Sequence, residues 1–363
     1  MNKIIIVGCG IVGATIAYEL SLIPQLDVTV IEQKTPASGS TGAALGVLMG
    51  VISGKKKGRA WKYRDYSLRR YETLIPEIEA KTGLKIPVNH QGIVKLLFSD
   101  DNLAKWHQLQ QIRQSNGWQL EIWDRKDLNI KCPQIQDQRI IAAVYSPQDR
   151  QINPQILTET LVSAATKNGV EFKFGVTVNQ LLSSKQEEYC QGIITSQGHW
   201  DTDWLIIAAG LGSTPLTASV RQKLDLRPVL GQAIRLRVNK ILGQAEFQPV
   251  ITGNDVHIVP QANQEYWLGA TVEFPDEIGT VTVKSELLEQ VIADAISFCP
   301  ALQDATIIES WSGKRPRPQG QAAPVIGKLA GYANVLLATG HYRNGVLLAP
   351  ATAKEILAIV GNH

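Results

Sequence analysis

The sequence predicts an α/β fold in which a discontinuous domain built on a parallel sheet carries an inserted domain with a mixed, largely antiparallel sheet. A glycine-rich turn between an apolar strand and a helix opens the chain. Two later apolar strands end in similar small-residue turns, and strand-rich segments of a different character lie between these pieces. Alternation of strands with helices indicates a parallel sheet, whereas consecutive strands indicate antiparallel pairing.

The composition is that of a globular protein with about two domains. The chain has 363 residues, of which 44% are hydrophobic and 19% are charged. A formal net charge of +3 gives little support for nucleic-acid binding. We interpret the basic run Lys55–Arg59 as a solvated loop rather than a phosphate or lipid patch. We therefore expect no nucleic-acid partner.

The cysteines and the apolar runs indicate the compartment. The four cysteines form no C-x-x-C pair and no metal-ligand cluster with the six histidines: Cys9, Cys132, Cys190 and Cys299. This usage suits a reducing compartment, and we expect neither disulfides nor a metal. Glycines interrupt the apolar N-terminus, so we do not interpret it as a signal peptide. No later run reaches the roughly 18 apolar residues of a membrane-spanning helix. We expect a cytoplasmic protein without a transmembrane segment.

The N-terminal segment carries a dinucleotide-binding fingerprint. A β-branched strand leads into Gly8, Gly10 and Gly13 at G-x-G-x-x-G spacing, and a helical pattern follows to Leu20. A second strand ends at Glu32, about twenty residues after the glycines. The glycines permit a tight turn, close approach to a pyrophosphate and close helix packing, and the helix N-terminus favours phosphate. A lone G-x-G-x-x-G is weak, because glycine also serves ordinary turns, but here all four elements are in place.

Glu32 restricts the cofactor. Its carboxylate would accept hydrogen bonds from the adenosine ribose and repel a 2′-phosphate, so the sequence favours FAD or NAD over NADP. The small-residue run Ser38–Gly46 can approach a pyrophosphate and an isoalloxazine ring, or can be a flexible loop.

The remaining elements divide the chain. Buried strands at Asp203–Gly210 and Asn334–Gly340, the second followed by an apolar helical stretch to about Val360, assemble the nucleotide domain from residues 1–85, 148–220 and 323–363. Residues 86–147 and 221–322 form the predicted substrate domain. Strands are expected at Gly92–Phe98, Val229–Val238, Val256–Pro260 and Tyr266–Val272, and helices at Asn102–Ser115, Pro154–Lys167 and Lys284–Phe298.

Several motifs resemble a known family. His257–Pro260, Leu268–Thr271, Trp311–Pro316 and Gly340–Gly345 follow the fingerprint in the order found in the FAD-dependent D-amino acid oxidase (DAO) superfamily, and the chain is most similar to its glycine oxidase group. The resemblance covers nearly the whole chain. It implies a Rossmann-like FAD-binding domain and a flavoprotein that oxidises a small amino acid, namely glycine, sarcosine or a D-amino acid.

The implied reaction is amine oxidation by hydride transfer from Cα to flavin N5, with O2 reduced to hydrogen peroxide. A place in thiamine biosynthesis or in amino acid catabolism, and a homo-oligomeric state, also follow from the resemblance alone. Two alternatives remain open: a D-amino acid dehydrogenase type that passes electrons to a quinone or another carrier, and a flavoprotein with a structural or sensory cofactor.

Four residues are predicted to bind the substrate. Arg315 matches the family's carboxylate-binding arginine, whose guanidinium can hold a carboxylate bidentately. Arg343 can serve the flavin or the substrate. His257 and Val272 stand where glycine oxidases are expected to have tyrosine and methionine, and an imidazole at 257 predicts pH-dependent substrate binding near neutrality. No general base is evident. Lys314 and Arg317 match nothing in the family, and we interpret them as surface charges.

The motifs and the resemblance together predict the FAD site. The sarcosine oxidase branch of the family usually anchors FAD through a cysteine in the C-terminal third. Only Cys299 lies there in this sequence, in a helix-like stretch ahead of Trp311, so the resemblance implies that FAD is bound non-covalently. The predicted FAD-binding residues are Gly8, Gly10, Ile11, Val12, Gly13, Glu32, Gln33, Ser40, Thr41, Leu45, Gly46, Val47, Val178, Ala209, Gly210, Gly340, His341, Tyr342, Arg343, Asn344, Gly345, Val346 and Leu347.

Overall fold

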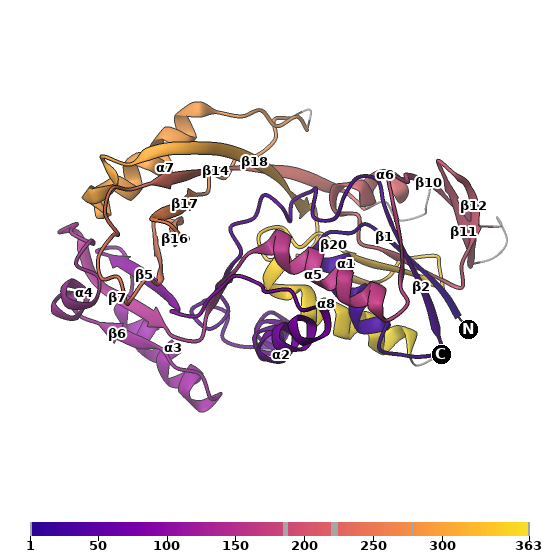
Figure 1. Cartoon of the computed structure of the whole chain (residues 1–363), viewed down its shortest axis with the longest axis horizontal. Coiled ribbons are helices and arrows are strands. Elements are labelled where there is room, and N and C mark those ends of the chain that lie inside the picture. The colour runs from indigo at the N-terminus through magenta and orange to yellow at the C-terminus, as the bar shows by residue number, and fades with distance from the viewer. Residues whose placement is uncertain (1, 184–187, 219–223, 278, 362–363) are drawn as a thin grey trace.

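The computed structural model describes residues 2–183, 188–218, 224–277 and 279–361, and two large sheets organise them (Figure 1). The first sheet has six strands and lies near both termini. All its neighbouring strands are parallel except the edge pair β19–β20. The strand order is β19 (Val325–Lys328), β20 (Val335–Thr339), β13 (Trp204–Ile207), β1 (Asn2–Val7), β2 (Leu26–Glu32) and β9 (Glu171–Phe174).

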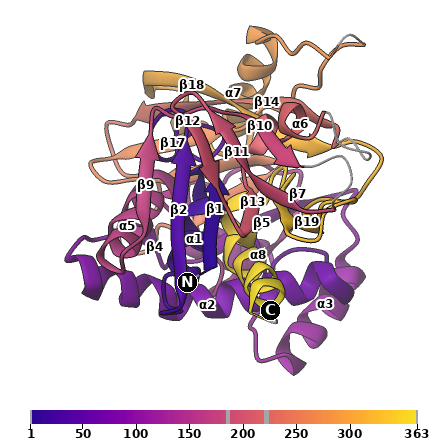
Figure 2. The ribbon, with the colours of Figure 1, turned by 90° about the vertical axis from the view of Figure 1, so that its right-hand side faces the viewer.

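Two layers cover the six-stranded sheet (Figure 2). In β1, Ile4 and Ile6 pack into a core shared with the helices, whereas Ile5 and Val7 pack with a small antiparallel sheet on the opposite face. Burial on both faces explains the continuous apolar run of this strand. The helices are α1 (Ile11–Leu20), α2 (Gly58–Thr82), α5 (Pro154–Lys167) and α8 (Gly345–Val360), and the small sheet is β10 (Val178–Ser183), β11 (Cys190–Thr195) and β12 (Gly198–Asp201).

The second sheet has eight strands, and all its neighbours are antiparallel except β15 and β5. Its two longest strands, β14 and β18, extend toward the first sheet (Figure 1). Helix α7 (Ser285–Phe298) covers part of one face. The order is β18 (Thr306–Pro318), β14 (Leu226–Arg237), β17 (Glu265–Gly269), β16 (Val256–Pro260), β15 (Val250–Gly253), β5 (Ile93–Phe98), β7 (Ile140–Ser146) and β6 (Glu121–Trp123).

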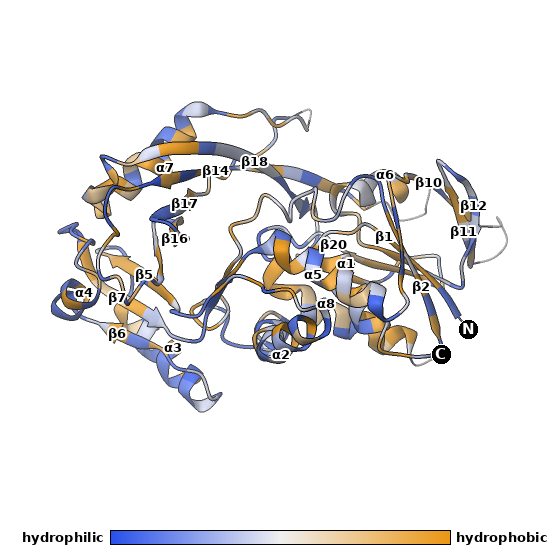
Figure 3. Cartoon of the chain, in the orientation of Figure 1, coloured by the Kyte–Doolittle hydropathy of each residue, from blue (hydrophilic) through white to orange (hydrophobic). Residues whose placement is uncertain are grey.

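Short elements complete the fold. Apolar residues gather on α8 and on the central strands, whereas α3 is largely polar (Figure 3). No helix in the described part of the chain is both long and apolar enough to cross a membrane. The short elements are the sheet β3 (Val47–Leu48), β8 (Arg150–Ile152) and β4 (Val88–Asn89), the helices α3 (Leu103–Ser115), α4 (Arg125–Lys131) and α6 (Ser213–Leu216), and the 3₁₀ turns Gly210–Gly212 and Pro300–Leu302.

The predicted fold class is confirmed, with two strands misplaced by three residues at one end. The strand expected at Val229–Val238 begins at Leu226 and ends at Arg237. The strand expected at Tyr266–Val272 ends at Gly269. Beyond it the chain turns toward β14, where the Thr271 N–H donates to the Gln232 carbonyl at 3.1 Å. Helix α2 was not predicted, because its residues are mostly polar and Pro76 interrupts the helical pattern. The domain boundaries stay a prediction.

A buried carboxylate and a buried guanidinium hold the loop before α2 from two sides. Asp149 is fully buried and accepts hydrogen bonds from the N–H groups of residues 50–52, each at 2.8 Å. Arg113, also fully buried, donates to the carbonyls of residues 51, 53 and 55 and lies 3.5 Å above the Trp61 ring. Desolvation raises the pKa of Asp149 in spite of these donors. The loop backbone thus depends on two side chains far away in sequence.

Replacing Asp149 with Ala is expected to lower the free energy of unfolding by about 3 kcal/mol or more, because the buried N–H groups of Val51 and Ile52 lose their acceptor and that of Gly50 keeps only the Leu48 carbonyl. Chemical denaturation measures the change. Asp27→Ala, at an exposed position on β2, serves as the control and should stay within about 0.5 kcal/mol of the parent protein. An equally small change for Asp149→Ala would show that the loop does not depend on this carboxylate.

Candidate active site

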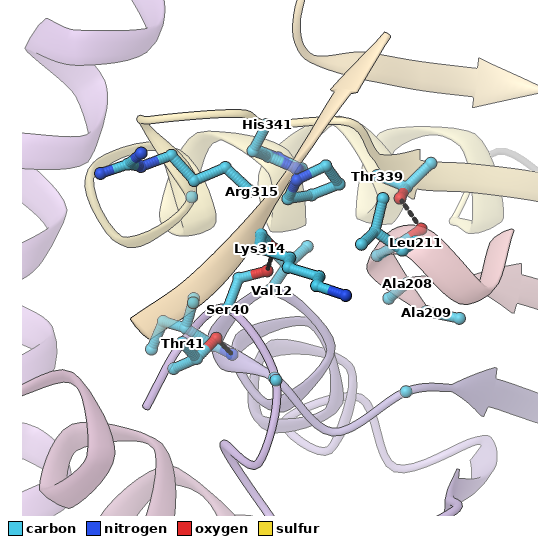
Figure 4. Close-up of a pocket in the computed structure, with 18 of the residues that line it drawn as sticks. Val12, Ser40, Thr41, Ala208, Ala209, Leu211, Lys314, Arg315, Thr339 and His341 are labelled. Atoms are coloured by element: carbon cyan, nitrogen blue, oxygen red, sulfur yellow. Dashed lines mark hydrogen bonds between the residues drawn. The ribbon is translucent and has the colours of Figure 1, made fainter. Parts of the chain in front are cut away.

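A cavity of about 870 Å³ lies at the carboxyl end of β1, between the six-stranded sheet and the strands β14 and β18. In open α/β sheets this is the end at which ligands bind. The lining comes from the turn after β1, the loop 38–47, the segment after β13, the strand β18 and the turn before α8 (Figure 4). Segments far apart in sequence therefore meet at one site.

The glycine turn after β1 leaves no room for side chains. Gly8 has φ +105°, and a Cβ there would lie 2.6 Å from the Ala208 carbonyl oxygen. A Cβ on Gly13 would lie 2.0 Å from the Gly8 carbonyl oxygen, so α1 packs directly on the turn. The Ile11 N–H donates to Thr41 Oγ1 at 3.0 Å (Figure 4). The turn and the N-terminus of α1 can therefore cradle a phosphate group.

Glu32 ends β2 at the cavity, where the ribose of a dinucleotide would lie. Its Oε2 accepts from the Cys9 N–H at 2.9 Å, and its Oε1 accepts from the Lys34 N–H at 3.0 Å. These bonds orient the carboxylate, and each oxygen keeps a lone pair for a hydroxyl group. The fingerprint geometry therefore fits the adenosine half of a dinucleotide with a free 2′-hydroxyl.

Arg315 projects from β18 at the other part of the cavity. Its Nη1 donates to the carbonyl oxygens of Leu230 at 3.1 Å and Thr271 at 3.0 Å. No carboxylate of the described residues forms an ion pair with it. Gly231 leaves the space that Arg315 needs, because a Cβ there would lie 2.2 Å from Nη2. Both Nη1 hydrogens are used, so Nε and Nη2 remain as a fork for a ligand carboxylate.

Arg343 lies in the turn between β20 and α8. Its side chain is about one-third exposed and meets Asp255 at 3.4 Å. Burial lowers the pKa of Arg315, and the positive charge of Arg343 lowers it further, whereas Tyr342 and Glu273 act in the opposite direction. The two guanidinium groups are therefore close enough to repel each other, and an anion between them would relieve that repulsion.

His257 lines the cavity and is partly buried. Its Nδ1 is buried without a hydrogen-bond partner in the described structure. Burial, followed by the charge of Arg343, lowers the pKa of His257 to about 4. Because desolvation and the surrounding cations disfavour the charged form, this lowered pKa favours a neutral imidazole at pH 7 instead of the titration near neutrality that the sequence predicted.

His341 is buried in the same turn as Arg343. Its Nε2 lies 2.8 Å from Thr352 Oγ1, which donates its hydrogen to the Leu348 carbonyl at 2.9 Å. Because that hydroxyl has one hydrogen, Nε2 must be the donor, and Nδ1 is left as an acceptor. Burial lowers the pKa of His341 to about 3, so the ring contributes no charge at neutral pH.

The structure brings most of the predicted site residues together. Of the predicted FAD-binding residues, all but Gly13 and Asn344 line the cavity, as do Arg315 and His257. Gly13 supports the turn from behind, and Asn344 precedes α8 and accepts from Arg64 at 3.2 Å. Val272 does not line the cavity, and the strand expected to carry it ends at Gly269.

Several residues that line the cavity were not predicted from the sequence. Gly231 and Ala233 come from β14, which pairs with β18, and Ala270 directly follows the end of β17. Lys314 also lines the cavity although its side chain is exposed, so its interpretation as a surface charge is incomplete. Arg317 lies outside the lining and stacks on Phe274 at 5.1 Å. A glycine inside a strand can indicate that another group approaches the backbone closely, and Gly231 in β14, against the Arg315 guanidinium, is such a glycine.

Comparison with known proteins agrees with this geometry. The sequence profile described as FAD dependent oxidoreductase (DAO) matches residues 3–359. A bifunctional protein ThiO/ThiG of Nostoc sp. is 30% identical over 364 residues, which are 99% of this chain and 52% of that protein. The chain thus spans about half the length of that relative. Glycine oxidase of Bacillus subtilis is 25% identical over 358 residues, covering 99% of this chain and 92% of the enzyme.

Solved structures show the same architecture. Glycine oxidase from Bacillus cereus superposes with a TM-score of 0.85 at 25% identity and covers 100% of this chain and 96% of its own. L-proline dehydrogenase from P. horikoshii gives a TM-score of 0.86 at 20% identity, covering 99% and 93%, and shows the fold alone. The family expected from the motifs and its cofactor, FAD, are confirmed. The profile match along almost the whole length shows that this chain belongs to the DAO family of FAD-dependent oxidoreductases.

Proposed function

We propose that this FAD-dependent amine oxidoreductase is an oxidase of a small amino acid, namely glycine, sarcosine or a D-amino acid, that forms an imino acid and reduces O2 to hydrogen peroxide. The observation that carries the proposal is Arg315, a guanidinium that lines the cavity without a carboxylate partner in the described structure. Such a group favours a ligand carboxylate. Similarity to the glycine oxidase of Bacillus subtilis supports the substrate class.

The residues that line the cavity would hold the two halves of FAD at different ends. The glycine turn, the N-terminus of α1 and Glu32 would hold the ADP half of FAD. The segment Gly340–Leu347 would then meet the ring end, near Arg315. None of the four cysteines, all of which are buried in described parts of the chain, lines the cavity. This supports non-covalent binding of FAD.

The residues of the chain would orient the substrate and control its charge. Bound FAD supplies the acceptor for hydride transfer from Cα. The Nε and Nη2 groups of Arg315 would hold the substrate carboxylate and so fix the direction of the Cα–H bond. The charges of Arg315 and Arg343 disfavour a further positive charge and so favour the neutral amine that oxidation requires. Orientation and electrostatics then suffice without a general base.

Arg315→Ala is expected to raise KM for the amino acid about 100-fold or more, because a charge-assisted, bidentate contact is lost. FAD content should not change. Steady-state kinetics and the flavin absorbance of the purified protein measure both quantities. Arg237→Ala is the control, since Arg237 lies at the end of the neighbouring strand β14, outside the cavity lining, and pairs with Glu265. Unaltered KM in Arg315→Ala would remove the carboxylate clamp.

After anaerobic reduction by its substrate, the holoenzyme should be reoxidised rapidly on mixing with air-saturated buffer, with one hydrogen peroxide formed per flavin. Stopped-flow absorbance and a peroxide assay measure the two quantities. Slow reoxidation by O2 together with fast reoxidation by a quinone would contradict the oxidase and indicate a dehydrogenase instead.

The affinity of the holoenzyme for glycolate, a carboxylate without an amine, is expected to stay constant between about pH 5.5 and 8. With a pKa of about 4, His257 remains neutral over this range and gains its proton only in more acidic solution. Titration of the flavin absorbance at several pH values measures the affinity. An inflection near pH 6.5 that disappears in His257→Gln would show that His257 is charged in this range.

A further inference from the structure

Glu273 is a buried carboxylate outside the cavity lining, and its side chain accepts three hydrogen bonds. It is 2% exposed. Its Oε1 accepts from Thr271 Oγ1 at 2.5 Å and from Gln232 Nε2 at 2.8 Å, and its Oε2 accepts from the Lys284 N–H at 2.9 Å and keeps one lone pair. All three donors are neutral. A buried charge held in this way is costly unless a cation lies near.

The nearby cation is Arg315. No ion pair joins Glu273 to a lysine, arginine or histidine within the described residues, but its charge acts on the Arg315 guanidinium through space. The two groups are separated by Thr271, whose hydroxyl donates to Glu273 and whose carbonyl accepts from Arg315 Nη1 at 3.0 Å. Thr271 therefore lies between an unpaired anion and an unpaired cation.

The main chain of Glu273 contacts the second anchor of Arg315 as well. The Glu273 N–H donates to the Leu230 carbonyl at 2.9 Å, and Arg315 Nη1 donates to the same oxygen at 3.1 Å. The Leu230 N–H in turn donates to the Glu273 carbonyl at 2.9 Å. Glu273 thus contacts both residues that hold Arg315: its backbone bonds the Leu230 carbonyl, and its side chain bonds the hydroxyl of Thr271.

The hydrogen bonds around Glu273 also include Gln232 on β14. The Gln232 N–H donates to Thr271 Oγ1 at 2.8 Å, and Gln232 Nε2 donates to the Lys284 carbonyl at 2.8 Å. Because the Thr271 hydroxyl both donates and accepts, its position is set from two sides. Displacement of the Glu273 carboxylate would remove the acceptor of the Thr271 hydroxyl and loosen the residue whose carbonyl accepts from Arg315.

We propose that Glu273 is a positioning residue for substrate binding, which fixes the Leu230 and Thr271 carbonyls so that Arg315 presents Nε and Nη2 to the substrate carboxylate. The inference rests on the proposed role of Arg315. The proposal predicts the direction in which the loss of Glu273 changes the affinity for an anion. The loss of a negative charge alone would strengthen the attraction of an anion to this part of the cavity, whereas the loss of positioning weakens binding.

A double-mutant cycle in the FAD holoenzyme tests the proposal, with glycolate as the probe and flavin absorbance as the readout. Glu273→Gln keeps the shape and removes the charge, and it is expected to raise the Kd of glycolate about tenfold in the parent protein. In the Arg315→Ala background the same change should have no effect, because Glu273 acts through Arg315. Glu309→Gln, an exposed carboxylate paired with Arg235 on the same sheet, is the control and should leave the Kd unchanged.

The outcomes distinguish the proposed function from the positioning role of Glu273. An unaltered Kd in Arg315→Ala alone would overturn the proposed function. Weak binding in Arg315→Ala combined with unchanged or tighter binding in Glu273→Gln would overturn the positioning role and leave the proposed function intact. An equal loss in both backgrounds would also overturn it, since a general structural defect does not require Arg315. If Glu273→Gln does not retain FAD, Thr271→Val takes its place in the cycle, with the same expected dependence on Arg315.

Discussion

Two backbone carbonyl groups, those of Leu230 and Thr271, hold the Arg315 guanidinium at the cavity, and the chemistry proposed for the site depends on this arrangement. A carboxylate partner would neutralise the arginine and occupy the fork that a substrate needs. Carbonyl acceptors orient the group while leaving its charge available to a ligand. The cost is a partly desolvated cation, which the lowered pKa of Arg315 reflects. The negative charge of the buried Glu273 offsets part of this desolvation cost.

The fold supplies this arrangement by joining two sheets at one cavity. The six-stranded sheet contributes the glycine turn and Glu32, and the eight-stranded sheet contributes Arg315 and His257. Strand β18 is long enough to reach from one part to the other, as Figure 1 shows. Dinucleotide and substrate can therefore be recognised by different sheets, with the reacting groups where the two meet.

The sequence predicted the nucleotide half of the site well, because its determinants are local. Gly8, Gly13 and Glu32 act within one βαβ unit, where spacing alone fixes their relative positions. The substrate half was harder. Gly231 reaches the cavity through the long-range pairing of β14 with β18, Ala270 follows the end of β17, and Val272 lies outside the lining. The neutral state of His257 arises from burial and from Arg343, which no local pattern encodes.

The most direct test of the central claim compares amino acids with amines that lack only the carboxylate, under anaerobic conditions. The FAD holoenzyme is mixed with glycine, sarcosine or D-alanine, and in parallel with methylamine, dimethylamine or ethylamine, while flavin bleaching is followed. If Arg315 binds the substrate carboxylate, at least one of the amino acids should bleach the flavin. Its matched amine, at the same concentration, should bleach the flavin at least 100-fold more slowly, which corresponds to a difference of about 3 kcal/mol in activation free energy. Failure of all three amino acids, or equal rates for an amino acid and its matched amine, would contradict this role of Arg315.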